Sequence, residues 1–378
     1  MKSANELLIT QLNERKAAGL LRETKRVDDL IDFCSNDYLG LARNRELSLA
    51  LATDFSEWIS RQPNESPING SSGSRLISGQ SEGVEIFETQ CAAMHQAEAA
   101  LLFGSGYEAN IGLISALAQK EHVLFCDKLL HASLIDGLRL SAAERRIFKH
   151  NDLADLVHLL EQYPTSTTKW VIVESIYSMD GDQAPLAELI ALREKYQFEL
   201  IVDEAHAGGI YGAMGEGLGA SYPEIFARVI TFGKAWGIAG AVVLGSTILK
   251  QYLINFARPF IYSTAPTPEH IQHLLTVMPY IQRASEERKN LKKNIEFFKK
   301  HARSTSWGDS DTAIQTFFVS GNEAVRAVAK SAQNAGFAVK PIVYPTVPKG
   351  KERIRITLTS LTKESDILAL IQTLESHA

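Results

Sequence analysis

The chain has 378 residues, of which 45% are hydrophobic and 22% charged, and this composition excludes a disordered or collagen-like protein. A chain of this length exceeds one ordinary hydrophobic core, so we expect two packed units or one large α/β domain with an appendage. The net charge of -5, with Lys and Arg scattered rather than massed, favours no nucleic-acid partner.

The three cysteines are widely spaced and form no Cys-x-x-Cys pair: Cys34, Cys91 and Cys126. This spacing argues against a disulfide framework and against a zinc site, and we expect no metal. No apolar signal segment follows Met1, and the longest apolar stretch, 238–244, is too short to cross a bilayer. We therefore expect a cytoplasmic protein without a membrane partner.

The elements expected in the first two thirds of the chain alternate between helices and strands. An amphipathic helix at about 5–21 precedes a short strand at 30–34, a turn at 35–40, and helices at 86–94 and 109–118. The strand-like runs are short and almost continuously apolar: 99–103, 122–126, 170–174, 199–202, 228–232 and 241–244. This pattern predicts a mainly parallel central sheet with helices on both faces.

After Pro268 the pattern changes to a long helical region, at 269 to about 302. A second α/β set follows, with strands or helices at 314–319, 323–335, 339–343, 353–358 and 364–375. We therefore expect three parts: an N-terminal helix and arm at 1–44, a large domain at 45–268, and a linking helix with a smaller C-terminal α/β domain at 269–378.

Ligands of open α/β sheets gather beyond the carboxyl ends of the strands, so the residues that follow each strand are the first candidates. A glycine turn, 104–110, follows the strand at 99–103 and precedes a helix. Backbone N–H groups at such a turn suit a phosphate. A turn with no ligand is the ordinary alternative, and the Gly-Lys-Ser/Thr ending of a Walker loop is missing.

Polar side chains also follow two further strands. Asp203 and His206 follow the strand at 199–202, and a buried carboxylate there requires a partner, which could also be a salt bridge or a helix N-terminus. Lys234 lies beside Gly233 after the strand at 228–232. Desolvation would lower the pKa of this lysine and make it a nucleophilic amine, although a solvated surface lysine is the commoner case.

A phosphate-binding turn, a buried Asp, a His and a desolvated Lys are together the groups that pyridoxal phosphate requires. Lys234 would form the Schiff base, and Asp203 would keep the pyridine nitrogen protonated so that the ring accepts electrons. A dehydrogenase would instead need Gly-x-Gly-x-x-Gly early in the chain, and that motif is not found.

Ordered motifs extend this interpretation from about residue 33 to residue 361. They lie at 35–41 (SNDYLGL), 73–79 (GSRLISG), 127–133, 178–182 (SMDGD), 202–206 (VDEAH), 231–234 (TFGK), 261–264 (IYST), 345–348 (PTVP) and 353–357 (RIRIT). On these motifs the chain resembles the α-oxoamine synthases, a family of the fold-type I, aminotransferase-like pyridoxal-phosphate enzymes. The resemblance implies that fold and that cofactor.

The resemblance also implies roles around the cofactor ring. Lys234 would carry the cofactor and later move the proton on the substrate Cα. His131 would stack over the pyridine ring, and Asp203 would pair with its nitrogen. His206, with Ser178 nearby, would hydrogen-bond the phenolic oxygen or the substrate.

The phosphate of the cofactor would be held by the backbone of Ser105, Gly106 and Tyr107 together with the Thr231 hydroxyl, by the same resemblance.

Residues outside this group would complete the site. Ser263 and Thr264 would reach the phosphate of the partner subunit, because enzymes of this family are homodimers with shared sites. Arg355 would clamp the carboxylate of the amino acid, a task that suits a planar guanidinium, and Asn36 would lie near that substrate.

The resemblance is nearest to the members that condense L-alanine with a pimeloyl thioester, with loss of CO2, to give a biotin precursor. Members that join glycine to acetyl-CoA or succinyl-CoA, or serine to palmitoyl-CoA, are the alternatives within the family. An aminotransferase or lyase and a non-catalytic regulator are alternatives outside it. Coenzyme A and acyl carrier protein are both possible thioester carriers. Ala235, Trp236 and Tyr344 depart from the family pattern.

Overall fold

The structure, a computed structural model, describes residues 3–24, 26 and 29–377, and the remaining positions of the expected N-terminal and C-terminal parts lie outside the described residues. The chain divides into two compact units. The larger unit comprises Asn36–Lys293 with Thr359–Leu361, and the smaller comprises Met1–Ser35, Asn294–Leu358 and Thr362–Ala378. This division differs from the expected boundaries, because it assigns 36–44 and 269–293 to the larger unit.

The larger unit contains a seven-stranded sheet in the order β2-β8-β7-β6-β5-β3-β4. Its strands are β2 (Ala99–Phe103), β3 (Val123–Asp127), β4 (Glu144–Phe148), β5 (Lys169–Glu174), β6 (Glu199–Asp203), β7 (Ala227–Thr231) and β8 (Ala241–Gly245). β8 runs antiparallel to both β7 and β2, and all other neighbours are parallel. The mainly parallel sheet is confirmed, and each of its six predicted strands is found to within one residue at either end.

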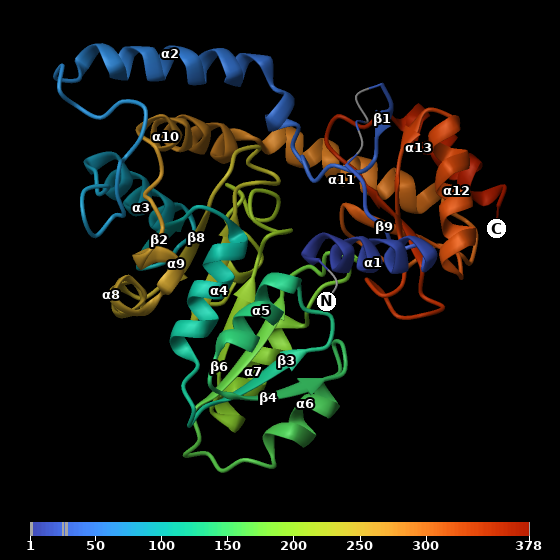
Figure 1. The fold of residues 1–378 in the computed structure, drawn as a ribbon, viewed down its shortest axis with the longest axis horizontal. Coiled ribbons are helices and arrows are strands. Elements are labelled where there is room, and N and C mark those ends of the chain that lie inside the picture. Colours follow the sequence, from blue (N-terminus) through green and yellow to red (C-terminus); the bar gives the residue numbers. More distant parts are fainter. Residues whose placement is uncertain (1–2, 25, 27–28, 378) are drawn as a thin grey trace. The chain divides into compact units, whose positions relative to one another are not determined.

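Helices cover both faces of this sheet (Figure 1). One face packs against α4 (Gly106–Leu117), α5 (Ala132–Leu140), α8 (Thr247–Phe256) and α9 (Arg258–Ile261), and the other against α6 (Leu153–Leu160) and α7 (Leu186–Tyr196). Successive side chains of each strand point to opposite faces. In β3, for example, Leu124 joins the first core cluster and Phe125 the second. Burial on both faces explains why the strands other than β4 are mainly apolar.

Three further helices of the larger unit are α2 (Arg45–Arg61), α3 (Glu82–Met94) and α10 (Pro268–Arg283). α10 packs against α2 and α3, which is the physical reason why 269–283 belongs to this unit. α11 (Ser285–His301) follows, so the single helical region expected at 269–302 is two helices separated at Ala284.

The smaller unit contains a three-stranded antiparallel sheet in the order β11 (Lys340–Ile342), β12 (Arg353–Thr357) and β9 (Ile314–Phe318). Helices α12 (Asn322–Asn334) and α13 (Glu364–Glu375) pack against each other, and α12 also packs on β11 and β12. The predicted α/β character of this part is confirmed.

The described N-terminal residues also belong to the smaller unit. α1 (Ala4–Ala17) precedes β1 (Ile31–Asp32), which pairs in parallel with β10 (Phe337–Ala338). The strand expected at 30–34 is therefore shorter than predicted. Among the described helices, none is both long and apolar enough to span a membrane.

Candidate active site

The carboxyl ends of β5, β6 and β7 lie at one edge of the large sheet, because these strands are parallel neighbours. Asp203 ends β6 and is buried, at 4% exposure. One of its oxygens accepts a hydrogen bond from Asn110 Nδ2 at 2.7 Å, and the other accepts from the backbone N–H of Ala205 at 2.8 Å. These donors provide the partner that a buried carboxylate requires.

Asn110 was not predicted as a site residue. It lies on α4, and its amide also donates to Ser133 Oγ on α5 at 2.9 Å. Asn110 is therefore the link that orients Asp203 relative to the first turn of α5. The sequence signal was its place at the end of the glycine turn, 104–110.

Lys234 lies in the connection between the antiparallel strands β7 and β8, and its side chain is half-buried. Its Nζ is 2.8 Å from His206 Nε2, and His206 Nδ1 is 2.6 Å from the hydroxyl of Tyr38. That hydroxyl donates to Asn36 Oδ1 at 3.3 Å. A hydroxyl that donates to Asn36 accepts from Nδ1–H of His206, which leaves Nε2 as the acceptor for the lysine amine.

The structure thus brings together three predicted residues, Lys234, His206 and Asn36, and one that was not predicted, Tyr38. Tyr38 is 1% exposed, so its hydroxyl is bonded inside the protein rather than to bulk water. Its sequence signal was its place in the motif at 35–41.

His131 precedes α5 and caps it, because Nδ1 accepts from the backbone N–H of Ser133 at 3.2 Å and lies 2.8 Å from Ser133 Oγ. Desolvation of the ring lowers the pKa of His131, the Asp203 carboxylate opposes this shift, and the Lys234 ammonium adds to it. The result favours a neutral imidazole, which suits a ring that stacks on another ring.

The predicted phosphate turn joins β2 to α4. Ser105 caps α4, and its hydroxyl accepts from the backbone N–H of Glu108 at 3.2 Å. A Cβ placed on Gly106 would lie 2.3 Å from Thr231 Oγ1, so only glycine allows this approach. The turn and the Thr231 hydroxyl, predicted to hold one phosphate, therefore lie side by side. The Tyr107 side chain is turned to Asp136, to which its hydroxyl donates.

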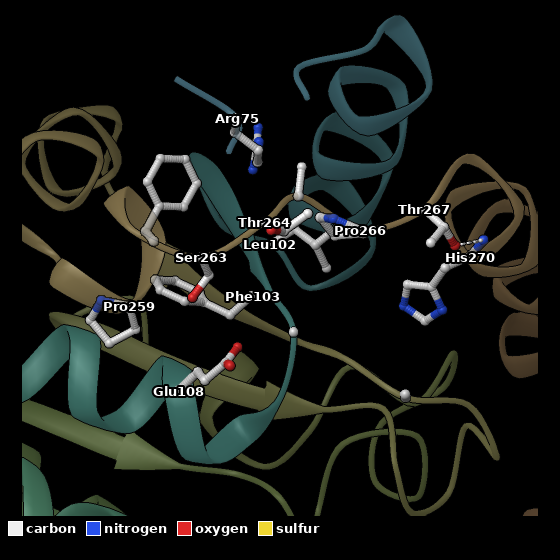
Figure 2. A pocket seen from close by; sticks show the side chains of 14 residues that line it. Arg75, Leu102, Phe103, Glu108, Pro259, Ser263, Thr264, Pro266, Thr267 and His270 are labelled. Carbon is white, nitrogen blue, oxygen red and sulfur yellow. Dashed lines mark hydrogen bonds between the residues drawn. The ribbon is translucent and has the colours of Figure 1, made fainter. Parts of the chain in front are cut away.

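Ser263 and Thr264 line a cavity of about 320 Å³ that also reaches Gly104 at the phosphate turn. Figure 2 shows Glu108, on α4, pointing toward the cavity from the side opposite Arg75. Neither Lys234 nor Asp203 lines this cavity. The cavity therefore adjoins the predicted phosphate turn at Gly104 and is not the place where Lys234 and Asp203 lie.

Two predicted residues remain. Ser178 is buried in the turn that follows β5, and its backbone N–H donates to the Glu174 carboxyl group. Arg355 lies on β12 in the smaller unit, where its Nη1 donates to Thr357 Oγ1 at 2.8 Å.

The residues of the larger unit fit pyridoxal phosphate. A half-buried amine, a buried carboxylate and a glycine turn at a helix N-terminus lie around one edge of the sheet. The amine suits the Schiff base, the carboxylate the pyridine nitrogen, and the glycine turn the phosphate. Fold and site together define the class of fold-type I pyridoxal-phosphate transferases.

Comparison with known proteins agrees with this class. The family of aminotransferases class I and II matches residues 28–374. An 8-amino-7-oxononanoate synthase of Azoarcus sp. (strain BH72) is 38% identical over 92% of this chain and 87% of its own length. Among solved structures, a Sphingomonas wittichii serine palmitoyltransferase has a TM-score of 0.87 and 25% identity, and covers 100% of this chain and 98% of its own. An 8-amino-7-oxononanoate synthase from Francisella tularensis has a TM-score of 0.76 and 27% identity, with 92% and 98% covered.

The chain belongs to the aminotransferase class I and II family and, within it, to the α-oxoamine synthases. It is an enzyme, and its cofactor is the pyridoxal phosphate of that family. The predicted family, fold and cofactor are confirmed. The substrates typical of the family are an amino acid and an acyl thioester.

Proposed function

We propose that this enzyme condenses L-alanine with a pimeloyl thioester to give 8-amino-7-oxononanoate, CO2 and the free thiol carrier, as a step of biotin biosynthesis. The observation that supports this choice is the 38% identity to an 8-amino-7-oxononanoate synthase over 92% of the chain. Identity to the serine palmitoyltransferase is lower, at 25%. The carrier is coenzyme A or acyl carrier protein.

Pyridoxal phosphate, when bound, supplies an electron sink for the bonds at the amino-acid Cα. In our proposal Lys234 attaches the cofactor, and its amine, once released, moves the Cα proton. His206 lies 2.8 Å from that amine and accepts from it. Asp203 would keep the pyridine nitrogen of the bound cofactor protonated, and the neutral ring of His131 would lie against the cofactor ring. Asn110, through its bond to Asp203, holds the carboxylate in one orientation.

The phosphate and the substrate carboxylate have their own ligands in this proposal. The backbone of Ser105–Tyr107 and the Thr231 hydroxyl bind the phosphate, supported by the close approach of Thr231 to Gly106. Arg355 binds the carboxylate of alanine through its guanidinium. Asn36 lies near the amino acid, supported by its link through Tyr38 to His206.

The substrate assignment is tested by incubating the purified enzyme with L-alanine, glycine or L-serine, each with pimeloyl, acetyl or palmitoyl thioester. Product is identified by mass, and thiol release gives the rate. We expect product only from L-alanine with the pimeloyl thioester. Product from glycine and acetyl-CoA alone, or from serine and palmitoyl-CoA alone, would overturn the assignment.

Lys234→Ala is the matched variant for this experiment. Because it removes the amine that attaches the cofactor and moves the proton, we expect the condensation rate to fall by about 10⁴-fold or more. Turnover close to that of the wild type would contradict the role of Lys234.

A further inference from the structure

Glu174 is a buried carboxyl group at the edge of the sheet where the predicted site residues lie, and none of the roles above uses it. It is the last residue of β5 and is 2% exposed. The register of the sheet pairs it directly with Asp203, the last residue of β6. Two carboxyl groups therefore lie side by side within the protein, and only Asp203 has an assigned task.

The bonds of Glu174 connect two segments that meet at the site. Its Oε1 accepts the backbone N–H of His131 at 2.5 Å, and the carboxyl group also accepts the backbone N–H of Ser178. His131 begins α5, after β3, whereas Ser178 belongs to the turn after β5. One side chain thus fixes the backbone of both segments.

We propose that Glu174 is a positioning residue, which holds the backbones of His131 and Ser178 at the spacing that the cofactor ring requires. The proposal rests on the proposed function for the roles of His131 and Ser178, but not for the identity of the substrates. Glu174 does not itself touch the reacting atoms in this account.

The charge of Glu174 follows from its surroundings. Burial raises the pKa of Glu174 well above its usual range, and the carboxylate of Asp203 raises it further, while Lys234 and the two backbone N–H groups oppose the rise. Two adjacent carboxyl groups do not both ionise readily in a buried place. Burial and the neighbouring Asp203 carboxylate thus both favour the neutral form of Glu174.

Two variants of Glu174 with similar volume show whether the side chain acts by accepting hydrogen bonds or only by filling space. Glu174→Gln keeps a neutral oxygen acceptor, whereas Glu174→Met has none. Apo protein is titrated with pyridoxal phosphate, and the dissociation constant and the visible circular dichroism of the bound cofactor are measured. We expect Glu174→Met to bind at least ~10-fold more weakly, with a reduced dichroic signal, because the backbone N–H groups of His131 and Ser178 lose their acceptor. Glu174→Gln should stay within ~3-fold of the wild type, since its amide oxygen takes the place of the carboxyl oxygen as acceptor.

Glu204→Gln is the control for loss of a buried carboxyl group. Glu204 is 0% exposed and bonds Arg228 and the backbone of Gly219 instead of the predicted site residues. We expect it to lower the thermal midpoint of the apo protein without changing the cofactor spectrum. Unchanged affinity and dichroism in Glu174→Met, or equal defects in Glu174→Gln and Glu174→Met, would overturn the proposal.

The cofactor titration tests the role of Glu174 separately from the substrates in the proposed function. If the wild type binds pyridoxal phosphate but does not condense L-alanine with the pimeloyl thioester, the substrate assignment fails while the cofactor titration still decides the role of Glu174.

Discussion

Tyr38 connects the beginning of the larger unit to the proposed catalytic pair. Its hydroxyl is 2.6 Å from His206 Nδ1, and His206 lies 2.8 Å from the Lys234 amine. The bond fixes both the orientation of the imidazole ring and the nitrogen that faces the lysine. Loss of the hydroxyl removes this bond from His206 Nδ1 and the restraint that the bond places on the ring.

For Tyr38→Phe we expect kcat to fall about 10-fold, while the fold is retained, because one buried hydrogen bond is lost at a positioning contact. The measurement is steady-state kinetics across a pH series, in which the variant should also show a shifted pH profile. Tyr196→Phe is the control, since the Tyr196 hydroxyl bonds Glu161 at 3.1 Å rather than a predicted site residue. Equal losses in the two variants would contradict a specific role for Tyr38.

The residues proposed to carry the chemistry could be predicted where they follow a recognisable strand. Asp203 stands directly after an apolar run, Lys234 follows another with only Gly233 between, and the glycine turn follows a third. Tyr38, Asn110 and Glu174 could not be assigned tasks in this way. Their contribution depends on bonds between segments far apart in the chain, and no local pattern specifies which buried polar groups meet.

The histidine His150 links its own segment to two others, the end of β3 and the turn after β5. His150 follows β4, its Nδ1 is 2.9 Å from Asp127 at the end of β3, and its Nε2 is 2.6 Å from Asp182 in the turn after β5. Asn151 bonds the same two aspartates. Asp182 belongs to the turn that contains Ser178. The bonds of His150 and Asn151 to Asp182 and the bond of Glu174 to Ser178 therefore restrain the same turn.

The cluster predicts a loss of stability at alkaline pH. Desolvation lowers the pKa of His150, but the bonds and charges of Asp127 and Asp182 outweigh it and raise the pKa from 6.5 to about 10. A group whose pKa is higher in the folded state contributes fully below the unfolded value, and its contribution is lost as pH rises through the folded value. The stabilisation from His150 is therefore complete below pH 6.5 and disappears by about pH 10.

We expect chemical unfolding to show this loss between pH 7 and about 10 in the wild type, on the order of a few kcal/mol. His150→Gln should be less stable at pH 7 and should lose less of its remaining stability over the same range. His158→Gln, on the exposed side of α6, is the control and should follow the wild type. An alkaline loss in His150→Gln as large as that of the wild type would rule out the histidine as its source.

The elements themselves were predictable where burial was complete. β2 was predicted residue for residue, because it is apolar and wholly buried. β4, in contrast, has the sequence Glu-Arg-Arg-Ile-Phe and was not predicted. β4 is the edge strand beside β3, and only Phe148 of its five residues is buried, so its charged side chains reach solvent and the apolar signal disappears. α2 was also missed, since only Leu47 along it is buried.

The family resemblance predicts a homodimer in which Thr264 of each chain binds the cofactor phosphate in the site of the other chain. Mixed dimers of two inactive variants test this. Lys234→Ala removes the amine of one site, and Thr264→Glu places a negative charge against the phosphate of the other chain's site. A mixed dimer then contains one intact site, so random mixing should restore about a quarter of the wild-type activity.

The control for this experiment pairs Lys234→Ala with Asp203→Ala. Both residues are predicted to serve the site of their own chain, so no mixed dimer has an intact site and no activity should return. If the Thr264 pair also stays inactive while mixed dimers are present by mass, Thr264 does not act across the interface.

The antiparallel pairing of β7 with β8 restricts how Lys234 can work. The loop between them is closed at its base by Thr231 opposite Ala241, and the N–H of Phe232 donates to the carbonyl of Gly240 at 2.9 Å. Within the loop, the N–H of Gly237 donates to the carbonyl of Lys234 at 3.0 Å. The carbonyl of Lys234 is thus held by a bond within the loop, and the loop itself is held at its base. The hydrogen-bonded amides of Phe232 and Gly237 should therefore be protected from exchange with deuterium, with or without substrate, and we expect the reach of the amine to come from rotation about the side-chain bonds.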